Sequence, residues 1–212
     1  MAQISEIVPI KRLFAAAATM VLSVLLLTAG TARAGAATAD DPGAFLSGFA
    51  QRAVAMLADQ SLSEERRREA FRELLTSGFD VELIGRFALG RFWNHANEAE
   101  RREYRRLFEE FVIATYARRL GGYSGETLKV GASRDLSEKG VIVDSQIIRP
   151  KDPPVNVEWR LRRADSGWRI VDIVVEGISM AVAQRSEFAS VITNNGGTVE
   201  GLLKVLRKKT GG

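Results

Sequence analysis

Residues 155–176 of this 212-residue chain read VNVEWRLRRADSGWRIVDIVVE, and this stretch decides the fold class. Apolar and polar residues alternate from Val155 to Arg162, a pattern that is typical of a strand with one buried face. A turn sequence, Ala-Asp-Ser-Gly at 164–167, leads into a second segment from Trp168 to Glu176 that has little polar face. The stretch therefore predicts an antiparallel hairpin whose second strand is central or covered on both faces.

The segments on either side extend the hairpin into a sheet and surround that sheet with helices. Period-two patterns predict two earlier strands, at 127–133 and 141–147, and short connections make all the strands antiparallel. The chain is therefore expected to be an α+β protein with a four-stranded antiparallel sheet and helices before and after it. The expected helices, which follow from apolar residues spaced by three and four, cover 40–58, 61–76, 80–90, 98–120, 179–194 and the chain from 198 onward.

The helix expected at 98–120 has the strongest pattern in the chain. Asn97 and Glu100 have capping-box spacing at its start, as Ser61 and Glu64 do at the start of an earlier helix. Its apolar stripe and the apolar strands could together form a dry core, or they could enclose a cavity for a lipid, and periodicity does not distinguish the two. The stripe consists of Tyr104, Leu107, Phe108, Phe111, Val112, Thr115, Tyr116 and Leu120.

Composition excludes several classes of chemistry. The chain has no cysteine and one histidine, His95, so disulfide scaffolds, thiolate catalysis and Cys/His metal sites are excluded. The sequence contains no phosphate-binding loop, no dinucleotide fingerprint and no zinc-protease motif. Basic and acidic residues are interleaved at a net charge of +4, which argues against a nucleic-acid stripe. An enzyme reading remains open through a strand carboxylate, Asp172 or Asp144, acting as a base on an apolar substrate.

The first 34 residues are expected to be a secretory signal peptide. Lys11 and Arg12 precede an uncharged apolar run at 13–29, and Ala32-Arg33-Ala34 follows as a cleavage signature. A retained membrane anchor is the alternative, because the run is at the lower limit for crossing a bilayer. Residues 35–212 are expected to form a single domain that is stable through packing alone, since it has no cysteine.

From about Phe79 to Leu206, the chain resembles the toluene-tolerance family, the periplasmic phospholipid-binding (MlaC) component of the Mla lipid-asymmetry pathway. Single matching pieces are weak signals, but their order and spacing over this length are specific. The pieces are ALGRFW at 88–93, WRIVD at 168–172, EGIS at 176–179, QRSEF at 184–188, the segment 197–206, and the spaced aromatics Tyr104, Phe108, Phe111, Tyr116 and Tyr123.

The resemblance implies a soluble periplasmic lipid carrier with no catalytic activity, no cofactor and no metal. It implies that helices and a curved sheet, arranged as an NTF2-like cone, enclose an apolar tunnel for phospholipid acyl chains. Its partners would be an inner-membrane ABC transporter complex with a lipid-binding ring and an outer-membrane lipoprotein complex. The residues chosen to line the tunnel are Trp93, Phe108, Phe111, Val112, Tyr116, Val143, Ile147, Val157, Trp159 and Ile178.

Three other hypotheses remain open at this point. A branch of the same family is associated with hopanoid pathways, and its cargo is not distinguished by these residues. An NTF2-like enzyme that uses Asp172 or Asp144 would share the cone-shaped sheet. A secreted interaction module with a solid core would share the apolar composition.

Overall fold

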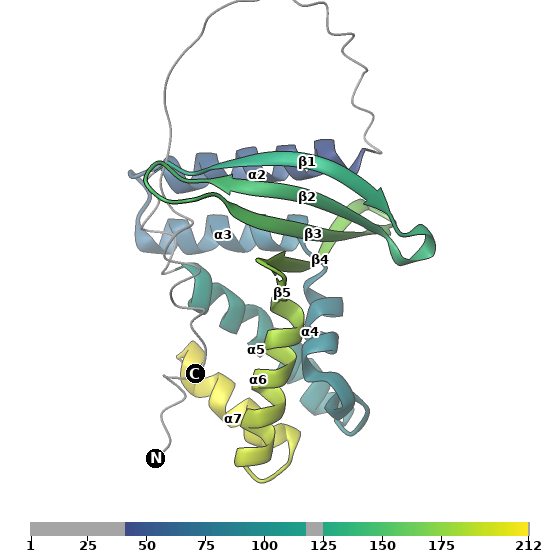
Figure 1. Ribbon diagram of the computed structural model, residues 1–212. Helices are drawn as coiled ribbons and strands as arrows, with labels where there is room; N and C mark the ends of the chain where they lie inside the picture. Colours follow the sequence, from purple (N-terminus) through teal and green to yellow (C-terminus); the bar gives the residue numbers. More distant parts are fainter. Residues whose placement is uncertain (1–40, 118–124, 212) are drawn as a thin grey trace, which may run out of the picture.

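The computed structural model describes residues 41–117 and 125–211, so the expected signal peptide lies outside the described residues. Some of the helices run along the sheet, and the others form a second layer beside it (Figure 1). The helices before the sheet are α2 (Pro42–Ala58), α3 (Glu64–Gly78), α4 (Val81–Leu89), the 3-10 turn η1 (Gly90–Asn94) and α5 (Glu98–Tyr116). The helices after it are α6 (Met180–Asn194) and α7 (Val199–Thr210).

All strands of the sheet are antiparallel and lie in the order of the sequence, which confirms the predicted α+β class. The sheet has five strands where four were expected. The additional strand pairs with the end of β4 after a tight turn at Glu176 and Gly177, whose φ angles of 48° and 81° are both positive, as in type I′ hairpin turns. The strands are β1 (Thr127–Asp135), β2 (Val141–Ile148), β3 (Val155–Ala164), β4 (Gly167–Val175) and β5 (Ile178–Ser179), with the 3-10 turn η3 (Ser137–Lys139) between β1 and β2.

The hairpin that opened the sequence analysis is formed by β3 and β4. Val155, Val157 and Leu161 of β3 are buried on one face, which we call the inner face, while the alternate residues of β3 point to the outer face. On β4, Asp172 and Val174 share the outer face, yet both are buried because α4 and α6 contact this strand. The prediction of a strand covered on both faces is therefore confirmed.

The caps explain where the helices begin, and they correct one prediction. Asn97 and Glu100 form the expected capping box at the start of α5, with bonds of 3.0 and 2.8 Å to each other's backbone N–H. The box expected between Ser61 and Glu64 is wrong. Ser63 is the N-cap of α3 and accepts a hydrogen bond from the backbone N–H of Arg66, whereas the Ser61 hydroxyl is 2.6 Å from an Asp59 carboxylate oxygen.

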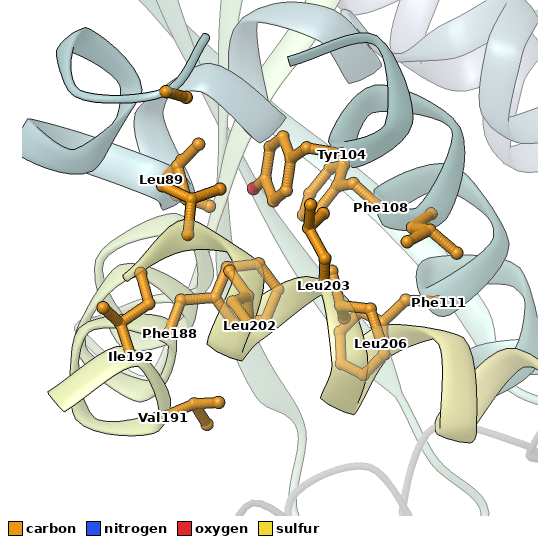
Figure 2. Close-up of a cluster of buried hydrophobic side chains, with 14 of the residues drawn as sticks. Leu89, Tyr104, Phe108, Phe111, Phe188, Val191, Ile192, Leu202, Leu203 and Leu206 are labelled. Carbon is orange, nitrogen blue, oxygen red and sulfur yellow. The ribbon is translucent and has the colours of Figure 1, made fainter. Parts of the chain in front are cut away.

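The two larger of the three apolar clusters in the described residues hold the helices to one another and to the sheet. One is a helical cluster, in which side chains of α4, α5, α6 and α7 meet around Phe188 (Figure 2). The other lies between the inner face of the sheet and α2, where Leu46 and Phe49 pack on Val143 and Leu161. Within 41–117 and 125–211, no helix is both long enough and apolar enough to cross a membrane.

Candidate functional site

The inner face of the sheet is covered unevenly. In one half, which we call the covered half, α2 packs directly on the strands. Leu46 of α2 and Val143 and Ile170 of the sheet are completely buried there, and Phe49 is nearly so. The centre of this half is filled, because its completely buried side chains leave no room for a further apolar group, while residues at its edge such as Phe45 and Trp168 are half-buried.

The other half of the inner face, which we call the open half, is built from strand residues and Met180 at the start of α6. Val155, Val157 and Val175 are its buried base. Among the described residues, α2 and α3 contribute no member to this cluster. The side chains that surround the base are only half-buried although they belong to the inner apolar face, and they are Ile147, Trp159, Ile173 and Met180.

The indole of Trp159 stands at the boundary between the two halves and is fixed in place. Its Nε1–H donates a 2.8 Å hydrogen bond to Ser145 Oγ, and the Ser145 hydroxyl donates in turn to the Val157 carbonyl at 3.0 Å. Its ring lies edge-on to Phe49 at a centroid distance of 6.1 Å. Since the polar atoms of this pair are satisfied, the open half presents a hydrocarbon surface without an unpaired polar group from Ser145 or Trp159.

The predicted lining residues divide between distant parts of the fold. The structure brings together four of them on the inner face of the sheet, namely Val143 in the covered half and Ile147, Val157 and Trp159 at the open half. Trp93, Phe108 and Phe111 instead belong to the helical cluster, against which Val112 packs. Tyr116 is half-buried at the last residue of α5, and Ile178 of β5 is 46% exposed.

Three of the four aromatic side chains of α5 point toward α4, α6 and α7. Tyr104, Phe108 and Phe111 each contact the ring of Phe188, with centroid distances between 5.7 and 6.2 Å (Figure 2). The Tyr104 hydroxyl donates a 2.8 Å hydrogen bond to the Gly85 carbonyl, and burial raises the pKa of this phenol well above its usual value. The phenol is therefore a neutral hydrogen-bond donor that ties α5 to α4.

The two candidate catalytic carboxylates lie on the outer face of the sheet. Asp172 is 8% exposed and accepts hydrogen bonds from the Ser179 hydroxyl at 2.6 Å, the Ala181 backbone N–H at 3.0 Å and Arg160 at 3.3 Å. These bonds attach the start of α6 to β4. Asp144 pairs with Arg134 at 3.1 Å in a more exposed position. Neither carboxylate reaches the apolar inner face, where a base for an apolar substrate would have to act.

The described residues contain no group of three or more His, Cys, Asp or Glu side chains arranged to hold a metal ion. His95, the single histidine of the sequence, is exposed at the end of η1.

Sequence reasoning did not name Ser145, Ile173 and Met180 as members of this site. The sequence did mark Ser145 as unusual, because it is a polar residue at an inner position of β2, where the other inner residues are apolar. Ile173 was hidden in a strand with little polar face, and Met180 lies in a helix start whose orientation depends on the bonds to Asp172.

Comparisons with known proteins agree with this architecture. A family model described as MlaC protein matches residues 48–208. The intermembrane phospholipid transport system binding protein MlaC of Haemophilus influenzae is 22% identical over 121 residues, which are 55% of this chain and 56% of that protein. This chain therefore spans little more than half the length of that curated relative.

A solved structure shares the fold. The phospholipid-binding protein of Ralstonia solanacearum, in complex with a phospholipid, superimposes with a TM-score of 0.71 at 22% sequence identity. The match covers 81% of this chain and 97% of that one. Because the family model extends over most of the sequence and the architecture agrees with it, this chain belongs to the MlaC family.

Proposed function

We propose that this protein is a periplasmic carrier that binds the acyl chains of a phospholipid and moves the lipid between membranes. The observation that carries the proposal is the open half of the sheet, where Ile147, Trp159 and Ile173 remain half-buried on the inner apolar face. A surface of this kind is unfavourable in water unless another apolar group covers it. An acyl chain is such a group.

The energetics of the cargo agree with an uncharged apolar site. Each methylene group that leaves water contributes about 0.8 kcal/mol, so an acyl chain supplies affinity over its whole length without any charged contact. The open half offers valine, isoleucine, methionine and indole surfaces for this purpose. We propose that the headgroup stays in water and that the chains contact Ile147, Val157 and Trp159, with Tyr116 at the end of α5 as a further contact.

The partners and the compartment are part of the same proposal. The Haemophilus influenzae relative is named for an intermembrane phospholipid transport system, which supports a role between two membranes. We propose an inner-membrane ABC transporter complex with a lipid-binding ring as one partner and an outer-membrane lipoprotein complex as the other. Removal of residues 1–34 as a signal peptide would deliver the chain to the periplasm.

Native mass spectrometry of the protein purified from its own cells tests this function. The expected result is one lipid copy for each protein, with a mass that identifies the cargo as a phospholipid and distinguishes it from a hopanoid. A protein that carries no lipid, and that takes up none from added phospholipid, would refute the carrier. The same spectra give the N-terminus and so test the signal peptide.

A substitution in the polar outer face separates the carrier from the enzyme. Asp172→Asn weakens the bonds to Ser179 and Ala181, so it is expected to lower stability while lipid binding is retained, because the carboxylate does not reach the inner face. Glu158→Gln is the matched control, because Glu158 is a more exposed carboxylate of the same face and pairs with Arg134 at 3.0 Å. Loss of an enzymatic activity on an apolar substrate in Asp172→Asn, with folding intact, would favour the enzyme.

A further inference from the structure

A groove lies between α4, η1 and α6, in the helical layer of the protein. Its volume is about 430 Å³. None of its lining residues carries a negative charge, and three of them are arginines from three different elements of the fold. The lining consists of Leu83, Arg86, Phe87, Gly90, Arg91, Trp93, Asn94 and Arg185, and we call it the arginine groove.

Each arginine of this groove stacks on an aromatic ring. The guanidinium carbon of Arg86 lies 5.6 Å from the ring centroid of Trp93, and that of Arg91 lies 5.0 Å from Phe92. A guanidinium group in such a cation–π contact still has N–H donors that can bind a carboxylate or a phosphate. The arginine groove therefore presents oriented hydrogen-bond donors.

Arg185 is held from two sides. Its guanidinium carbon lies 5.3 Å from the ring centroid of Phe87. On another side is Gly90, whose φ of 58° brings its backbone so near that a Cβ there would be 2.8 Å from Arg185 Nε. A side chain at position 90 would push the guanidinium away, so glycine permits the close approach that positions Arg185.

The three guanidinium groups have no anionic partner within residues 41–117 and 125–211. Several other arginines in the described residues do have such a partner. Arg207, for example, binds Glu103 at 2.7 Å and Glu200 at 2.9 Å. The acid on α4, Glu82, is already paired with Arg105 at 3.2 Å. Three positive charges thus face solvent with their donors unused, which is the arrangement of an anion-binding surface.

Exposed apolar side chains adjoin these charges. Phe87 is 41% exposed and lines the groove itself, and Val182 is 50% exposed one turn before Arg185 on α6. Ile178, which is 46% exposed, lies just before α6 begins. Arginine, aromatic and aliphatic side chains together are suited to the boundary of a bilayer, where phosphate groups lie above the ends of hydrocarbon chains.

We propose that the arginine groove docks the protein on a lipid surface by binding the phosphate groups of anionic phospholipids. The proposal deepens the carrier function and rests on it, because the complexes that would exchange the cargo lie in membranes, and docking on the surrounding lipid would bring the carrier to them. Three separated guanidinium groups fit the repeated phosphates of a bilayer better than a single carboxylate. The exposed side chains of Phe87 and Val182 would then lie between the headgroups.

Vesicle binding by the protein purified from its own cells tests this docking. The probes are vesicles of phosphatidylglycerol and phosphatidylethanolamine, vesicles of phosphatidylcholine alone, inorganic phosphate, and polyglutamate as an acidic chain. A groove variant replaces all three arginines by glutamine. A matched control removes three other exposed positive charges, from α2, α3 and β1, as Arg52→Gln, Arg66→Gln and Lys129→Gln.

The wild-type protein is expected to bind the anionic vesicles and to lose binding as salt is raised. Each membrane-facing arginine contributes roughly five-fold, so the groove variant is expected to bind about a hundred-fold more weakly. The control variant is expected to stay within about five-fold of wild type, because its substitutions are on α2, α3 and β1, which contribute no residue to the groove.

Several results would overturn the proposal. Equal weakening of the groove and control variants would show a general effect of charge. Binding of inorganic phosphate without vesicle binding would indicate a free anion as the ligand, and groove-dependent binding of polyglutamate alone would indicate an acidic protein. Lipid retention, read in parallel by native mass spectrometry, is expected to be unchanged in the groove variant. Absence of lipid from the wild type would instead refute the carrier function itself.

Discussion

The Ile147→Trp substitution places an indole ring on the open half of the sheet, where we propose that the acyl chains bind. Ile147 of β2 lies between Leu128 of β1 and Val155 of β3 and is half-buried on the inner face. If this half is a binding surface, the larger ring occupies space that the lipid uses. If it is a filled core, the ring has no room, and the protein is destabilised.

The two alternatives differ in the expected changes of lipid affinity and of protein stability. A ring that displaces about two methylene groups of an acyl chain removes roughly 1.6 kcal/mol of apolar burial, at about 0.8 kcal/mol for each group. The expected Kd for lipid therefore rises about fifteen-fold. The free energy of unfolding of the lipid-free protein should change by less than about 1 kcal/mol, because the ring enters space that the protein leaves open.

Val143→Trp is the matched control in the covered half. Val143 is completely buried beneath Leu46 and Phe49, so an indole there should cost about 1–3 kcal/mol or more through overpacking. Urea unfolding of both lipid-free variants measures stability, and competition with a fluorescent phospholipid measures affinity. The reasoning is refuted if Ile147→Trp destabilises the protein as much as Val143→Trp. It is equally refuted if Ile147→Trp leaves lipid affinity unchanged.

Two further predictions concern stability. Gly78→Ala would place a Cβ 2.3 Å from Phe49 Cε2, so it should cost about 1–3 kcal/mol, whereas Gly48→Ala in α2, whose Cβ would approach nothing closer than 3.9 Å, should stabilise by about 0.5–1 kcal/mol. Thermal unfolding compares the two, and equal effects would contradict the packing argument. The hydrogen bonds from Arg207 lower the pKa of Glu103 below its usual 4.5, so this pair stabilises the fold above about pH 4.5 and loses its effect as the pH falls through the lowered pKa. The stability difference between wild type and Glu103→Gln should therefore be constant above pH 5 and shrink in more acidic urea titrations; a difference independent of pH would exclude this linkage.

Local signals in the sequence predicted the elements well. The Asn97 and Glu100 box, the turn at 164–167 and the caps at Asp80, Ser179 and Thr198 all depend on a few neighbouring residues. The fifth strand escaped prediction because two residues cannot show a period, and its existence depends on pairing with β4. Ser61 was chosen over Ser63 because the spacing to Glu64 fits a box, whereas the chain uses the Ser63 hydroxyl for the N–H of Arg66.

The candidate site was harder to predict, because periodicity identifies an apolar face but not the partner of that face. The aromatic stripe of α5 suggested that Phe108 and Phe111 face the sheet. Their partner is Phe188 of α6, about 80 residues later in the sequence, which local patterns do not contain. The alternation of β2 and β3, by contrast, assigned Ile147, Val157 and Trp159 to one face, because neighbouring antiparallel strands share the same period.

The helical cluster also constrains when the chain can fold. The last element in the sequence that contributes to it is α7, whose Leu202, Leu203 and Leu206 are almost completely buried against α5 and α6. A growing chain without these C-terminal residues leaves the Tyr104 and Phe108 rings without their cover. The compact state of this cluster is then available only after α7 has been synthesised. If the chain crosses a membrane unfolded, as we propose, the late contribution of α7 would delay folding of the helical cluster until the segments before it have been made.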